Sequence, residues 1–158
     1  MGKAANSSIS LKQIHVTDNF WNKYVHLVKD VIIPYQWDIL NDKLEDVETS
    51  HCIENFKIAA GEKEGEFQGA VFQDTDVAKW LEAVGFVLNY ERDEKLEELA
   101  DETIELIGRA QQPDGYLNTY FTIKEPDGRW SNLMEGHELY TAGHMIEAAV
   151  AYYEATGK

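Results

Sequence analysis

The sequence predicts a mainly α-helical fold built of helix hairpins, and two observations carry this prediction. Apolar residues recur at helical spacing over residues 77–88 and again over residues 96–110. A few polar residues, 90–93, join the two runs, so the two helices are expected to pack as antiparallel neighbours. With 158 residues, of which 44% are hydrophobic, the chain can bury the core of one domain.

The N-terminal segment is expected to be irregular and then extended. Residues 1–8 are polar and are predicted to be a disordered or tag-like N-terminus. Apolar residues alternate over residues 9–16 with one slip in the pattern, which indicates a short strand with a bulge. One domain is expected to cover residues 9–158, because no linker or repeat divides them.

A kinked helix is predicted next. Thr17 or Asp18 can cap a helix that begins near Phe20. Pro34 has no backbone N–H and is therefore expected to end or kink that helix. A second helical piece is expected directly afterwards, over about residues 35–44.

The middle of the chain combines a loop with the start of the hairpin. Residues 49–70 contain three glycines and little periodicity, which indicates a loop with one short helix around residues 53–59. The acidic run 74–76 marks a helix N-terminus, because the helix dipole favours negative charge there. Asp93 is expected to cap the second helix of the hairpin.

The last part is expected to hold a small β-hairpin and a long helix. Turn-forming residues at 111–115 and 125–128 flank a stretch that looks extended, which predicts a hairpin ending near Trp130. A helix is predicted over about residues 135–155, with Gly157 at the position of a C-cap glycine.

Charge and cysteine content exclude several classes of function. The net charge is −15, which argues against nucleic acid or an anionic membrane as a partner. The single cysteine, Cys52, excludes an internal disulfide and a multi-cysteine metal site made by this chain alone. No apolar run approaches a membrane span, and the start lacks the apolar core of a signal peptide. Cytoplasmic location is therefore the default expectation, with secretion or a periplasmic location left open.

The last helix carries the most informative pattern. A helical projection places His137, Tyr140, Thr141, His144 and Ala148 on one side. The opposite side is apolar and comprises Leu139, Ala142, Ile146, Ala149, Val150 and Tyr153. Side chains that both donate and accept hydrogen bonds suit the lining of a pocket, although histidines of a second core layer give the same pattern. The two histidines are two turns apart, which does not match the His-Glu-x-x-His zinc motif.

Three other places offer weaker candidates for ligand contact. Asp74 and Asp76 can grip sugar hydroxyls or act as acid and base, but capping of the following helix also explains them. Trp130 lies beside polar loop residues and suits stacking on a sugar ring. Trp80 falls on an apolar stripe and is expected in the core. Gln36 follows the expected kink and can reach a pocket.

Four segments taken together carry a resemblance to a known family. They are residues 33–37 (IPYQW), 74–83 (DTDVAKWLEA), 111–121 (QQPDGYLNTYF) and 137–151 (HELYTAGHMIEAAVA). These segments resemble the N-terminal part of glycoside hydrolase family 127, the β-L-arabinofuranosidases. The resemblance implies an (α/α)6 barrel, of which this chain would be the N-terminal portion, followed by β-sandwich domains. It also implies retaining hydrolysis of terminal β-L-arabinofuranosides in plant-type glycans.

The resemblance also implies which residues are used. In the family, the nucleophile is a zinc-bound cysteine held with other cysteines and a glutamate, and all of these, with the acid/base glutamate, lie beyond the matched segments. Cys52 does not match the nucleophile, so no catalytic residue and no metal ligand is expected in this chain, and zinc is expected only in the full-length family. His137 and Glu138 match residues that border the bound arabinose, and Gln36 is a similar candidate. The weaker candidates are His144, Asp74, Asp76 and Trp130.

The main hypothesis is an N-terminal fragment of such a glycosidase, inactive alone, that supplies part of the sugar subsite. The predicted helices cannot close a twelve-helix barrel, so apolar faces are expected to need a partner. That partner would be the remainder of the barrel or a self-associating copy. The alternatives are a stand-alone helical carbohydrate-binding or scaffold module, and another α/α-barrel sugar enzyme such as an epimerase or an unsaturated-uronide hydrolase.

Overall fold

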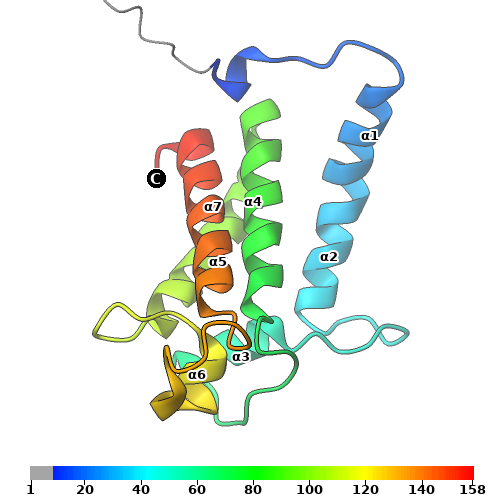
Figure 1. Ribbon diagram of the computed structural model, residues 1–158. Helices are drawn as coiled ribbons and strands as arrows, with labels where there is room; N and C mark the ends of the chain where they lie inside the picture. Colours follow the sequence, from blue (N-terminus) through cyan, green and yellow to red (C-terminus); the bar gives the residue numbers. More distant parts are fainter. Residues whose placement is uncertain (1–8) are drawn as a thin grey trace, which may run out of the picture.

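A computed structural model describes residues 9–158, and the regular elements in that range are all helical (Figure 1). The strand predicted over residues 9–16 is wrong: Leu11–Gln13 form a turn of 3₁₀ helix. Residues 9–158 contain no strand that could pair with this segment, and an unpaired strand leaves its backbone groups without partners. The predicted tag-like segment, residues 1–8, lies outside the described residues.

The first long helix runs through Pro34 without ending. It comprises α1 (Trp21–Leu27), a π-helical turn (Val28–Ile32) and α2 (Ile33–Leu40). Of the two outcomes predicted for Pro34, an end or a kink of the helix, the end does not occur. Pro34 stands in the first turn of α2, directly after the wider π-helical turn, where a missing backbone N–H is tolerated. The cap prediction is confirmed, since the Asp18 carboxylate accepts hydrogen bonds from the N–H groups of Phe20 at 3.0 Å and of Trp21, the first residue of α1, at 2.8 Å.

The predicted helix hairpin is confirmed. A short helix, α3 (Cys52–Ala59), precedes α4 (Asp74–Tyr90), and α5 (Glu94–Ala110) returns antiparallel to it (Figure 1). Asp93 caps α5 as expected, because its carboxylate accepts hydrogen bonds from the N–H groups of two first-turn residues at 3.2 and 3.1 Å.

The predicted β-hairpin near Trp130 is wrong. Its place is taken by a short helix, α6 (Thr119–Ile123), and a 3₁₀ turn over Pro126–Gly128. Asn118 caps α6 by accepting a hydrogen bond from the backbone N–H of Phe121 at 3.1 Å. Burial of Phe121 then holds this turn of helix against the body of the protein, which outweighs the local preference for an extended chain.

The last helix, α7 (Glu138–Thr156), runs beside α4 and in the same direction (Figure 1). Gly85 allows the close approach: a Cβ built there would lie 2.8 Å from the backbone carbon of Ala151. Gly157 ends α7 as predicted, with φ of 80° and its N–H bonded to the carbonyl of Tyr153 at 2.8 Å. None of the helices described is both long and apolar enough to cross a membrane.

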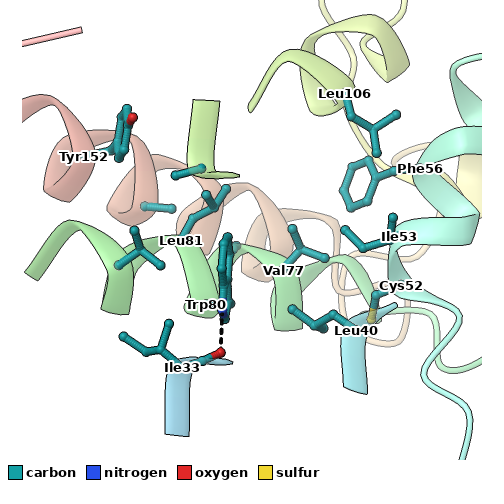
Figure 2. Close-up of a cluster of buried hydrophobic side chains, with 14 of the residues drawn as sticks. Ile33, Leu40, Cys52, Ile53, Phe56, Val77, Trp80, Leu81, Leu106 and Tyr152 are labelled. Atoms are coloured by element: carbon teal, nitrogen blue, oxygen red, sulfur yellow. Dashed lines mark hydrogen bonds between the residues drawn. The ribbon is translucent and has the colours of Figure 1, made fainter. Parts of the chain in front are cut away.

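The core lies where α4 meets α2, α3, α5 and α7. Trp80 is 2% exposed, and its indole N–H donates to the carbonyl oxygen of Ile33 at 3.1 Å, as Figure 2 shows. Trp37 of α2 packs on its ring with centroids 4.5 Å apart. The prediction that Trp80 belongs to the core is confirmed. The bond also fixes α2 against α4, and these two helices carry the walls of the groove described below.

Candidate functional site

A groove of about 360 Å³ lies between α2 and α4. Gln36 of α2 and Asp76 and Lys79 of α4 line it with polar groups, while Trp80 belongs to its apolar wall. Asp76, Lys79 and Trp80 share one face of α4 because they are spaced three and four residues apart. The groove therefore combines hydrogen-bonding groups of both senses with an apolar surface, as sugar-binding sites do.

A cluster of rings borders this groove across Lys79. His137, which directly precedes α7, and Tyr140 of α7 pack edge-on with Phe72, with ring centroids 5.1 and 6.5 Å from that of Phe72. The His144 ring lies 4.6 Å from that of Tyr140 and perpendicular to it. The Lys79 ammonium group lies 5.5 Å from the centre of the Tyr140 ring, a cation–π contact that joins the cluster to the groove.

The polar side of α7 is thus divided between the cluster and the core. Thr141 and Ala148 are buried, whereas Tyr140 is exposed and His144 is partly buried. The side of α7 that the sequence identifies as apolar is exposed instead, with Ile146 64% exposed. Small side chains on α7 give the closest approach to α4, so packing follows size rather than hydrophobicity here.

Glu138 lies beneath the cluster and is only 2% exposed. One carboxylate oxygen accepts a hydrogen bond from the hydroxyl of Tyr116, and the other accepts one from the backbone N–H of Trp130 at 2.7 Å. Burial, and secondly Glu138 itself, raise the pKa of Tyr116, which therefore stays protonated as a donor. This carboxylate ties the loop before α7 to the helix, and His137 next to it has φ of 52°.

Trp130 joins the Glu138 anchor rather than the groove. Its backbone N–H binds Glu138, and its ring meets that of Tyr116 edge-on at 5.4 Å while remaining 51% exposed. The exposed ring keeps it a candidate for stacking on a longer glycan.

The two aspartates at the start of α4 have different environments. Asp74 is buried and accepts hydrogen bonds from the backbone N–H of Thr119, at 2.7 Å, and from its hydroxyl. Burial raises the pKa of Asp74 to about 6. Asp76 faces the groove, and partial burial raises its pKa, while the charge of Lys79 opposes that rise. Of the two, only Asp76 can reach a ligand in the groove.

Cys52 is buried under the groove and has no activating partner. Its sulfur accepts hydrogen bonds from the Ser50 hydroxyl at 2.8 Å and from the Gln73 amide at 3.3 Å. Burial raises the pKa of Cys52 to about 11, so the thiol stays neutral near pH 7.

Sequence reasoning missed Lys79 and Phe72 as parts of the site. Lys79 follows Asp76 by three residues, which places the two on the same helix face and was a usable signal. Phe72 precedes α4 in a loop, and no periodicity of the sequence points to its contact with His137.

The arrangement of the helices defines a class of protein. The helices α4 and α7 are parallel neighbours, and α5 and the α1–α2 rod each run antiparallel to them (Figure 1). Helices that alternate in direction along the chain in this way form the wall of an α/α barrel.

Comparison with known proteins identifies the family. The family model described as "Beta-L-arabinofuranosidase, GH127 catalytic domain" matches residues 13–158. The chain belongs to this family. A "non-reducing end beta-L-arabinofuranosidase" of Bifidobacterium longum subsp. longum is 42% identical over 160 residues, which cover 91% of this chain and 24% of that protein.

Two solved structures of the family have the same fold. A GH127 β-L-arabinofuranosidase from Geobacillus stearothermophilus T6 is 64% identical with a TM-score of 0.91, over 92% of this chain and 23% of the other. A second GH127 β-arabinofuranosidase is 34% identical with a TM-score of 0.84, over 95% and 24%. The chain thus spans about a quarter of the length of these relatives.

Proposed function

We propose that this chain supplies one wall of the sugar site of a retaining glycoside hydrolase that acts on terminal β-L-arabinofuranosides of plant-type glycans. The family supports the reaction class, and the bifidobacterial relative is named for this activity. The observation that carries the proposal is the junction at Lys79. There the groove with Gln36 and Asp76 meets the ring cluster of α7.

The chemistry of the junction suits a neutral sugar. Gln36 can donate and accept hydrogen bonds, Asp76 accepts them, and Lys79 donates them. Neighbouring hydroxyl groups of a sugar would therefore find both donors and acceptors here. His137 and Tyr140 add an imidazole and a phenol at the border. Glu138 and Asp74 support this site from below, since their carboxylates are already engaged by internal donors. Both side chains are buried, so direct sugar contact by either residue would require its carboxylate to become exposed.

The nucleophile and its zinc ion do not fit the residues present here. A site of several thiolates needs more cysteines than Cys52, whose sulfur is buried against Ser50 and Gln73. We therefore assign the nucleophile, the acid/base glutamate and the family's zinc to polypeptide outside this sequence. We assign binding and orientation of the arabinose to this chain.

Calorimetric titration with methyl β-L-arabinofuranoside tests the assignment of the sugar wall. We expect weak binding, with a dissociation constant on the order of millimolar for so small a ligand. His137→Ala and Gln36→Ala should abolish measurable heat, while the matched control His26→Ala, on the exposed surface of α1, should leave it unchanged. Equal binding by all three variants would refute the site.

A turnover assay tests the division of labour. The purified chain, supplied with zinc, is expected to release no arabinose from an aryl β-L-arabinofuranoside. Robust turnover by the chain alone would overturn the assignment of the catalytic residues to polypeptide outside this sequence, and loss of that turnover in Cys52→Ser would place the nucleophile at Cys52.

A further inference from the structure

Three potential metal ligands converge between α4 and α7, on the side of the ring cluster away from His137. Glu82 comes from α4, and His144 and Glu147 come from α7, where they are three residues apart and share a face. One ligand atom from each residue lies within 4.8 Å of the other two. None of these three residues lines the sugar groove described above.

One ring nitrogen of His144 lacks a hydrogen-bond partner within residues 9–158. Its Nδ1 atom is closed to solvent and makes no hydrogen bond among the described residues. A carboxylate oxygen of Glu147 lies 3.1 Å from it without hydrogen-bond geometry. A buried ring nitrogen without a partner is costly unless something else satisfies it, and a metal ion does so through the nitrogen lone pair.

Electrostatics also favour a cation at this place. The carboxylates of Glu82 and Glu147 lie close together beside the His144 imidazole, in a protein whose net charge is −15. The nearest lysine along α4, Lys79, is directed to the hydroxyl of Thr75 at 3.4 Å and to the ring of Tyr140. A divalent ion would neutralise both carboxylates and tie α4 to α7.

We propose that Glu82, His144 and Glu147 bind a divalent first-row transition-metal ion of the zinc type. Imidazole together with two carboxylates suits Zn²⁺, Co²⁺ or Mn²⁺, whereas Ca²⁺ and Mg²⁺ prefer oxygen ligands alone. Three protein ligands leave a coordination position for water. The site contains no thiolate and is therefore different in kind from the cysteine-rich zinc site that the family resemblance implies.

The sequence gives no sign of this site because its ligands are not close in sequence. His144 and Glu147 alone form a common helical pair, and Glu82 lies on another helix more than fifty positions earlier. Only the parallel packing of α4 on α7 brings the third ligand into place.

Titration of the metal-free chain with Co²⁺, followed by visible absorption and by Zn²⁺ competition, tests the proposal. We expect about one equivalent of Co²⁺ to bind with d–d bands of a low-coordinate site, and Zn²⁺ to displace it. His144→Ala should weaken binding by about tenfold or more. Glu82→Gln keeps the shape of the side chain and should weaken binding similarly, with an unchanged circular dichroism spectrum, which guards against misfolding of the first variant.

Two controls separate this site from other metal binding. His26 lies on the exposed surface of α1, 3.8 Å from the carboxylate of Asp30. His26→Ala should leave the Co²⁺ affinity unchanged. Cys52→Ser should leave the spectrum unchanged, because no thiolate participates. Wild-type affinity in both His144→Ala and Glu82→Gln would overturn the proposal, as would an absence of Co²⁺ binding by the wild-type chain.

Discussion

Glu138 and Asp74 are buried carboxylates without an ion-pair partner among residues 9–158. Glu138 connects a loop to the start of α7, and Asp74 connects one to the start of α4. Glu138 bonds to Tyr116 and to the backbone of Trp130, and Asp74 bonds to the backbone and hydroxyl of Thr119. Charge-assisted hydrogen bonds of this kind offset the loss of hydration. Both residues therefore position the end of the molecule that holds the candidate site.

Replacing Glu138 by alanine should lower the free energy of unfolding by about 2–4 kcal/mol, because the substitution leaves two buried donors unpaired. Urea denaturation measures the change. Glu138→Gln retains acceptor capacity and should cost less. The neighbouring Glu135→Ala, at an exposed position, should change stability by less than about 0.5 kcal/mol. Equal effects of Glu138→Ala and Glu135→Ala would show that the anchor contributes nothing.

Asp74 should make stability depend on pH between about 4 and 6. Its folded-state pKa of about 6 exceeds the ordinary value of 3.8, so in this window the folded chain keeps a proton that the unfolded chain has lost. The free energy of unfolding should therefore fall as pH rises through the window, by up to about 3 kcal/mol from this group.

A comparison of the wild-type chain with a variant isolates the contribution of Asp74 to the pH dependence of stability. Urea unfolding of the wild-type chain and of Asp74→Asn is measured from pH 4 to pH 7, so that the shared titration of other groups cancels. The difference in stability between the two proteins should change with pH mainly between 4 and 6. A constant difference would contradict the raised pKa.

At the scale of elements, the contact between α4 and α7 depends on small residues. A Cβ at Gly85 would lie 2.8 and 2.9 Å from backbone atoms of Ala151 and Tyr152, and backbone cannot move aside as a flexible side chain does. Gly143, on α7 itself, is exposed, and a Cβ at this position would meet no neighbouring atom within 4 Å. Gly85 is thus required for the close contact between α4 and α7, whereas Gly143 is not.

Gly85→Ala should destabilise the chain by about 1–3 kcal/mol, because the methyl group forces the two helices apart. Gly143→Ala should instead stabilise it by about 0.5–1 kcal/mol, because alanine loses less backbone entropy in a helix. Thermal unfolding of both variants measures the two effects. Stabilisation by Gly85→Ala would mean that the helices do not pack this closely in solution.

At the scale of the whole molecule, large apolar surfaces remain uncovered, as expected for part of a barrel wall. The exposed large apolar residues of α1 and its surroundings include Phe20, Trp21, Tyr24, Leu27, Val28 and Val31. Those of α7 include Leu139, Tyr140, Ile146, Val150 and Tyr153. In a monomer such patches are aggregation-prone unless a partner buries them. We propose that the partner is the remainder of a barrel or a second copy of this chain.

The isolated chain should self-associate reversibly with rising concentration, and sedimentation velocity measures this. Ile146→Lys combined with Val150→Lys places two charges on the exposed face of α7 and should shift the distribution toward monomer without loss of helix content. Gln13→Lys combined with Thr17→Lys adds the same charge at exposed polar positions and should leave association unchanged. Identical behaviour of the two double variants would show that the α7 face is not the interface.

The sequence by itself determined the helix hairpin, a cap at Thr17 or Asp18, the cap at Asp93, the C-cap at Gly157 and the family. These features depend on spacing and on hydrogen bonds between residues close in the chain, which periodicity and capping rules describe. The same local rules failed over residues 9–16, because alternation predicts a strand only where a partner strand exists. They failed over residues 116–130 because the Asn118 cap and the burial of Phe121 favour a turn of helix there.

Only the tertiary structure decided which side chains meet. The sequence could propose Gln36, His137 and Asp76, but their grouping around Lys79 follows from the packing of α2 and α7 on α4. It could not show that Glu138 is held by Tyr116, or that Glu82 lies beside His144. Such contacts join residues far apart in the chain, and their geometry depends on how closely the helices approach, which small residues such as Gly85 control.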